Sequence, residues 1–172
     1  KNLGRVIEAM DAIRNVTDMP LVVIGTGDRY EKQVRQSVRE RNLSGRVIFL
    51  SDSQAAKLSS TFQNASDFPA IYQLATAMIY PSIFEGFGIP VLEALASELP
   101  VITSNLSCLP EAGGPGSLLI DPYSSEAMAE ALLRIVNEPD LIQTMKATGK
   151  KHADLFTPDI TARRVMDLYE TL

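Results

Sequence analysis

Two carboxylates and a glycine-rich turn lie together in the stretch SIFEGFGIPVLEAL, residues 82–95. Pro90 suits the first turn of a helix, because its missing N–H leaves no donor unpaired there. The backbone amides just before it would then be free at the positive end of the helix dipole, which is a binding site for a phosphate or another anion. Glycine also lets a ligand approach the backbone closely. The amides concerned are those of Gly86, Phe87, Gly88 and Ile89.

Glu85 and Glu93 flank this expected anion-binding site, with seven residues between them. A carboxylate does not bind phosphate, but it accepts strong, charge-assisted hydrogen bonds from neighbouring hydroxyls. The pair therefore favours a ligand with hydroxyl groups on both sides of a diphosphate, which is the layout of a nucleotide sugar. The alternative is that both glutamates are ordinary helix charges and that the glycines and the proline only form a turn. Spacing alone does not separate these interpretations.

Strands and helices alternate along the whole chain. The strands are short and apolar, and the first one, 21–24, is expected to be buried on both faces. Residues 51–67 are rich in serine and are expected to form a long loop with at most one short helix. The alternation predicts an α/β fold in which helices cover both faces of a parallel sheet. We predict strands at 21–24, 46–50, 77–80, 100–103 and 117–120, and helices at 3–16, 29–42, 68–76, 90–97, 124–136, 138–153 and 158–171.

Three sequence features should meet at one edge of that sheet, because ligands bind beyond the carboxyl ends of parallel strands. They are the GTGD turn with Gly25 and Gly27, the loop after the second strand, and the PSIFEGFGIP segment. The two glycines also invite a dinucleotide interpretation. The third glycine of that fingerprint would fall at Tyr30, so NAD is not predicted. A close-packed turn is favoured instead.

The composition is that of one soluble globular domain. The chain has 172 residues, 45% of them hydrophobic, and a net charge of −5, which gives no overall electrostatic case for nucleic acid or an anionic membrane. A single cysteine, Cys108, excludes an internal disulfide and favours a reducing, cytoplasmic setting. No apolar run is long enough to cross a membrane. The chain begins at Lys1 rather than methionine, and we interpret it as part of a longer protein.

Other reactive residues carry less weight. Cys108 has no histidine beside it and is interpreted as a buried small residue rather than a nucleophile. His152 lies in a charged segment and is expected to be solvated. Asp28 and Asp52 each stand alone, so no metal site is predicted. The basic run from Arg29 to Arg41 favours a solvated helix face over a phosphate or membrane patch.

The segment PSIFEGFGIPVLEALASELPVITSNLSCLPE, residues 81–111, resembles the signature of the retaining glycosyltransferases of family 4, which have the GT-B fold. That signature is a glutamate, seven residues and a second glutamate, with glycines directly after the first. The runs KNLGRVIEAM, LVVIGTGD, GRVIFL and IYQLATAMIYPS come before it, and LPEAGG and LLIDP complete it, all in the order of the family. The resemblance covers nearly all of the chain. It implies the Rossmann-like, donor-binding C-terminal half of such an enzyme, with the acceptor domain absent from this chain.

The resemblance also implies roles for individual residues. Glu85 corresponds to the glutamate that holds hydroxyls of the transferred sugar, and Glu93 to the one that holds the ribose. Lys1 corresponds to the lysine that binds the diphosphate and stabilises the leaving group. The family's arginine partner, upstream of that lysine, is not in this chain. Base recognition falls on the loop with Ser53, although a serine at Ser51 replaces the usual glycine.

The expected reaction follows from the family. The full enzyme would transfer a sugar from a nucleoside diphosphate sugar to a hydroxyl of a glycan, a lipid or a small molecule, without a metal or another cofactor. Contacts with the acceptor, and with a membrane if any, would belong to the absent half, so this chain is expected to bind nucleotide without catalysing transfer. Two alternatives stay open: a nucleotide-sugar epimerase of the same fold, and a non-catalytic module that binds a partner. The epimerase lacks this glutamate pair, and a non-catalytic relic would be expected to lose Glu85 or Lys1. The sequence names neither sugar, base nor acceptor.

Overall fold

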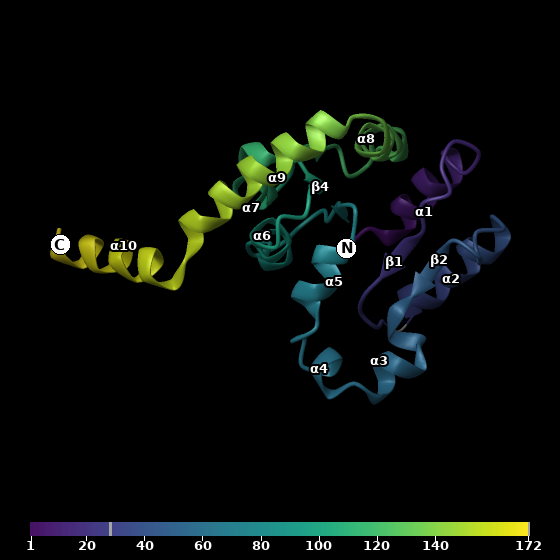
Figure 1. The fold of residues 1–172 in the computed structure, drawn as a ribbon, viewed down its shortest axis with the longest axis horizontal. Helices are drawn as coiled ribbons and strands as arrows, with labels where there is room; N and C mark the ends of the chain where they lie inside the picture. Colours follow the sequence, from purple (N-terminus) through teal and green to yellow (C-terminus); the bar gives the residue numbers. More distant parts are fainter. Residues whose placement is uncertain (28, 172) are drawn as a thin grey trace.

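The structure, a computed structural model, describes residues 1–27 and 29–171. Helices and strands alternate as predicted, and most predicted bounds agree within one or two residues (Figure 1). In chain order the elements are α1 (Leu3–Ala12), β1 (Leu21–Val23), α2 (Arg29–Glu40), β2 (Val47–Phe49), the 3-10 turn η1 (Leu50–Asp52), α3 (Gln54–Leu58), α4 (Ser60–Gln63), α5 (Phe68–Leu74), β3 (Met78–Tyr80), α6 (Ile89–Ala96), β4 (Val101–Ser104), α7 (Leu109–Gly113), η2 (Gly114–Gly116), β5 (Ser117–Ile120), α8 (Ser125–Asn137), α9 (Pro139–Ala153), η3 (Asp154–Phe156) and α10 (Pro158–Glu170).

The five strands of the described residues pair in parallel, but in two groups rather than the one sheet that was predicted. β1 pairs with β2, and β4 lies between β3 and β5. Within the described residues no ladder joins β1 to β3. A common apolar core holds the two groups together, because Val23 of β1, Ile79 of β3 and Ile102 of β4 pack in one cluster with α1, α2 and α8.

Helices cover both faces of the three-stranded group. Ile102 faces the core with α1 and α8, and its neighbour Val101 packs in a second cluster with α6 and α7, because successive side chains of a strand point to opposite faces. The prediction that strand 21–24 is buried on both faces is wrong. Val22 of β1 and Ile48 of β2 are 44% and 46% exposed, since α6 and α7 pack behind β3, β4 and β5 instead.

The segment 51–67 is the largest difference in secondary structure. It holds η1 and two short helices, α3 and α4, in place of a long loop. Ser53 and Ser59 begin these helices, and each side-chain oxygen accepts a hydrogen bond from the backbone three residues on. Serine content that indicated a loop therefore acts as helix caps. The first helix is also shorter than the predicted 3–16. α1 ends at Ala12, and the buried Ile13 packs from the turn that follows.

The C-terminal helices are joined to the fold through α9. A Cβ at Gly116 of η2 would lie 2.4 Å from the backbone nitrogen of Gly149 in α9, so the two backbones touch. α10 projects away from the strands beyond the end of α9 (Figure 1), and none of its residues is buried.

This close backbone contact makes a testable prediction. Gly116→Ala should lower the free energy of unfolding by about 1–3 kcal/mol, because backbone atoms of α9 must move to admit the methyl group. The matched control is Gly45→Ala, where a Cβ meets nothing within 4 Å. Urea denaturation of both variants provides the measurement. Equal stabilities of the two variants would contradict the observed packing of η2 on α9.

Candidate functional site

Lys1, Tyr80 and Glu85 form the centre of the candidate site. The Lys1 ammonium pairs with a carboxylate oxygen of Glu85, 84 positions away in the sequence, and also donates to the Tyr80 hydroxyl. It lies 4.8 Å from the centroid of the Tyr80 ring, within the range of a cation–π contact. The Tyr80 hydroxyl donates to the same Glu85 oxygen at 3.0 Å. The structure thus brings together the two residues predicted to be catalytic.

Hydrogen bonds from the Asn2 side chain fix the position of Lys1. Asn2 adopts a left-handed conformation with φ 62° just before α1. Its side-chain amide donates to the carbonyl of Pro81 at 3.2 Å and to that of Pro122 at 2.5 Å. The start of α1 is therefore tied to the ends of both β3 and β5, and Lys1 is directed to the carboxyl edge of the strands.

Hydrogen bonds within this cluster stabilise the charged forms of Lys1 and Glu85. Partial burial alone would raise the pKa of Glu85, but hydrogen bonds from Lys1, Ser82 and Tyr80 outweigh it and hold the pKa below its usual value. Burial would likewise lower the pKa of Lys1, and the hydrogen bonds to Glu85 and Tyr80 raise it instead. Both groups are consequently charged at neutral pH. The Lys1 side chain remains 61% exposed and can meet an anion.

The loop before α6 presents free amides, as predicted. Among the described residues, no hydrogen bond reaches the backbone N–H groups of residues 86–89. Gly88 caps α6 in a left-handed conformation with φ 107° and is buried, and a Cβ there would lie 2.9 Å from Leu109. Gly86 is exposed, and a Cβ there would meet nothing within 4 Å. The two glycines therefore differ: Gly88 is required by packing, and Gly86 alone leaves open space for a ligand.

Glu93 lies one turn inside α6 and is exposed. The Tyr72 hydroxyl of α5 faces its carboxylate at 3.5 Å. Burial, and then the neighbouring Glu93 charge, raise the pKa of Tyr72 to about 12, so its hydroxyl remains a donor at neutral pH. Glu93 is thus oriented from α5 and keeps acceptor capacity for hydroxyl groups.

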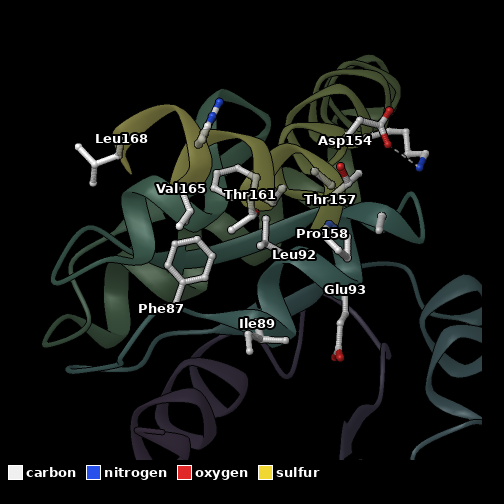
Figure 2. Close-up of a pocket in the computed structure, with 15 residues that line it drawn as sticks. Phe87, Ile89, Leu92, Glu93, Asp154, Thr157, Pro158, Thr161, Val165 and Leu168 are labelled. Atoms are coloured by element: carbon white, nitrogen blue, oxygen red, sulfur yellow. Dashed lines mark hydrogen bonds and ion pairs between the residues drawn. The ribbon is translucent and has the colours of Figure 1, made fainter. Parts of the chain in front are cut away.

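The Phe87 side chain serves packing. It lines a mainly apolar groove of about 820 Å³ between α6 and the region of η3 and α10. Figure 2 shows its ring inside this groove with Val165 of α10, while the Glu93 carboxylate extends away from α10. The ring also packs on Phe156 with centroids 5.6 Å apart. Only the backbone amide of Phe87 therefore remains for the predicted donor contact.

The turns after β1 and β2 contact each other. The Ser51 hydroxyl donates to the carbonyl of Gly25 at 3.1 Å, and Gly25 has a φ of 118°. The Gly27 amide donates to Glu31 of α2 at 2.5 Å. The Ser53 hydroxyl accepts from the Ala56 amide at 3.1 Å, as the cap of α3. The predicted donor-binding roles of Gly25, Gly27 and Ser53 stay predictions, and the Ser51–Gly25 hydrogen bond is the contact that joins the two turns directly.

Two minor sequence predictions need correction. His152 is packed rather than solvated: a ring nitrogen lies 2.8 Å from the carbonyl oxygen of Glu111, and the ring contacts Phe156 at 5.1 Å. Cys108 is half-buried, and its thiol donates to the carbonyl of Glu85 at 3.3 Å. The Ser107 hydroxyl donates to the same carbonyl at 3.1 Å.

Sequence reasoning missed Tyr80, Tyr72 and Ser107. A signal existed for Tyr80, because a tyrosine that ends a predicted strand lies at the ligand edge of the sheet.

Asp28 lies outside the described residues. Within the described ranges, no group of three or more His, Cys, Asp and Glu side chains is arranged to hold a metal ion. No helix there combines the length and apolar composition needed to cross a bilayer.

Known proteins resemble this chain over nearly its full length. A family model, Glycosyl transferases group 1, matches residues 1–152. O-antigen chain mannosyltransferase B of Escherichia coli is 26% identical over 100% of this chain and 43% of its own length. Sucrose-phosphate synthase of Thermosynechococcus elongatus has a TM-score of 0.79 and 26% identity, covering 99% of this chain and 42% of the synthase.

A more distant structure has the same fold. The Anabaena protein HepE, solved with UDP and glucose, has a TM-score of 0.77 at 17% identity, covering 98% of this chain and 44% of HepE. The chain therefore spans less than half the length of each of these three proteins.

The unequal environments of the two glycines predict unequal costs of substitution. Gly88→Ala should lower the free energy of unfolding by about 1–3 kcal/mol, because the methyl group meets Leu109 and the backbone is left-handed. Gly86→Ala, in open space, should leave it nearly unchanged. Thermal and urea denaturation of both variants test this. A similar loss in both would show that the loop before α6 is packed more tightly than the structure indicates.

The ion pair of Glu85 predicts a pH dependence with a definite sign. The folded pKa lies below the ordinary 4.5, so the pair's contribution is fully present above that value and is lost as the pH falls through the folded pKa. The difference in unfolding free energy between the native chain and Glu85→Gln should therefore be larger at pH 6 than at pH 3. Lys1→Met should reduce the effect. A difference that does not change over this pH range would exclude the ion pair as its source.

Proposed function

Because the chain belongs to the group 1 glycosyl transferases, we propose that it is the donor-binding half of a retaining enzyme of family 4. The full protein would transfer a hexosyl unit from a nucleoside diphosphate sugar to an acceptor hydroxyl. The observation that carries this proposal is the meeting of Lys1 and Glu85 beside free amides at the start of α6. The cation and the free amides suit a diphosphate, and the carboxylate suits the hydroxyl groups of a sugar attached to it.

Each group has a distinct role in the proposed reaction. The bond between the anomeric carbon and the diphosphate oxygen breaks, and a bond to the acceptor oxygen forms as the acceptor loses its proton. Lys1 and the amides of residues 86–89 stabilise the negative charge that develops on the leaving diphosphate. Glu85 accepts hydrogen bonds from sugar hydroxyls, and Glu93 accepts them from the ribose. The cationic side chain and the helix N-terminus take the place of a metal ion in this scheme.

The relatives leave the sugar, the base and the acceptor open. Their names include a mannosyltransferase and sucrose-phosphate synthases, whose products differ. HepE was solved with UDP, so uracil is one candidate base, and guanine is another. Contacts with the acceptor, and any with a membrane, would be made by the half of the enzyme that corresponds to the unmatched part of the relatives.

The two glutamates should affect binding differently. Glu93→Ala should weaken binding of a nucleoside diphosphate by about 1–3 kcal/mol, because its ribose hydrogen bonds are lost. Glu85→Ala should leave that binding nearly unchanged and weaken binding of the sugar-bearing donor. Calorimetric titration with UDP, GDP and ADP, with and without magnesium, is the measurement.

Glu130→Ala, an exposed carboxylate on α8, is the matched control and should bind as the native chain does. Selective binding of one nucleotide without magnesium supports the proposal and names the base. Equal binding by both glutamate variants and the native chain would refute the placement of the two carboxylates. Failure of all three nucleotides to bind would refute a donor site in this chain.

A further inference from the structure

Arg35 of α2 lies over the carboxyl end of β2. Its guanidinium carbon is 3.7 Å from the ring centroid of Phe49, the last residue of β2, so the planar group stacks on the ring. The side chain is only 27% exposed. The sequence places Arg35 in a run expected to be a solvated basic face, but this side chain folds back over the end of β2.

The guanidinium of Arg35 joins two carboxylates from different segments. Its Nε donates to Oε1 of Glu31 at 2.7 Å, and an Nη1 hydrogen bond reaches Oδ2 of Asp52 at 2.7 Å. The other oxygen of Glu31 accepts the backbone N–H of Gly27 at 2.5 Å. A continuous path thus runs from the turn after β1, through Glu31 and Arg35, to the turn after β2.

We propose that Arg35 is a positioning residue for the nucleotide, which sets the spacing between the turn at Gly27 and the turn at Asp52. This inference rests on the proposed function and on the donor-binding roles predicted from the sequence for Gly25, Gly27 and Ser53, which lie in these two turns. The link from the Ser51 hydroxyl to the Gly25 carbonyl is a second tie between the same turns.

The geometry requires arginine in particular. A guanidinium offers several donors in one plane, so it can bind two carboxylates while it stacks on an aromatic ring. A lysine carries the same charge but has neither the plane nor the fork. Hydrogen bonds from Arg35 and then from Gly27 lower the pKa of Glu31, so both oxygens of this residue act as charged acceptors in the path.

A similar ion pair elsewhere in the chain provides the control. Arg134 of α8 binds Glu138 through two nitrogens at 3.0 and 3.2 Å, with the same four-residue spacing as Glu31 and Arg35. This pair is more exposed than that of Arg35 and joins no turn at the strand ends. Removing either arginine deletes a helical ion pair, but only Arg35 connects the two turns.

The experiment measures nucleotide affinity by calorimetric titration with UDP, GDP and ADP. Arg35→Met should weaken binding of the nucleotide preferred by the native chain by about ten- to a hundredfold, because the two turns lose their fixed spacing. Arg35→Lys should restore little of this loss. Arg134→Met should change the affinity by less than about twofold, as expected for a distant site.

A double-mutant cycle separates positioning from general destabilisation. Glu31 and Asp52 are joined only through Arg35 in this path, so the effects of Glu31→Gln and Asp52→Asn on affinity should be non-additive. In the Arg35→Met background Asp52→Asn should have no further effect, and the effect of Glu31→Gln should shrink to that of its separate contact with the Gly27 amide. These two conservative variants keep the test usable if Arg35→Met does not fold.

The outcomes distinguish the two proposals. Native affinity in Arg35→Met, or additive effects of Glu31→Gln and Asp52→Asn, would overturn the role of Arg35 and leave the donor site intact. A native chain that binds none of the three nucleotides would overturn the proposed function and this inference with it.

Discussion

The ion pair between Lys1 and Glu85 closes the site across 84 sequence positions. It joins the start of α1 to the loop that opens α6, and the Tyr80 hydroxyl completes the contact from the end of β3. Lys1 is largely exposed, so the pair makes only a modest contribution to the stability of the fold. Its consequence is geometric, because it holds a cation and a carboxylate next to unpaired backbone amides at the carboxyl edge of the strands.

The parallel strands make this arrangement possible. Every βα connection begins at the carboxyl end of a strand, so short segments far apart in sequence converge at that edge. Asn2 ties the start of α1 to the carbonyls after β3 and β5. Thr103 of β4 donates to the carbonyl of Tyr80 at 2.9 Å. The ligand-facing groups are thus held by polar contacts between strand ends, and the apolar core beneath supports them.

Sequence periodicity predicted the helices and strands well because core positions repeat with the period of each element. It predicted less where local contacts decide. Caps at Ser53 and Ser59 turn a serine-rich stretch into helices, and the contact of Gly88 with Leu109 depends on α7, which the sequence did not indicate. The motif located both glutamates, but Tyr80 and Tyr72, which orient them, come from elements with no such motif. His152 was misjudged because its packing partners lie 41 positions away at Glu111 and beside it at Phe156.

The side chains behind the site differ in kind from those within it. Within it lie the unpaired backbone amides before α6 and the charges of Lys1, Glu85 and Glu93. Behind it, Ser107 and Cys108 both hold the Glu85 carbonyl, and Arg35 spans two turns through its charged partners. Such contacts fix the distances between segments of the chain. Substitutions among these supporting contacts can therefore change the spacing between segments while the Lys1–Glu85 pair stays intact.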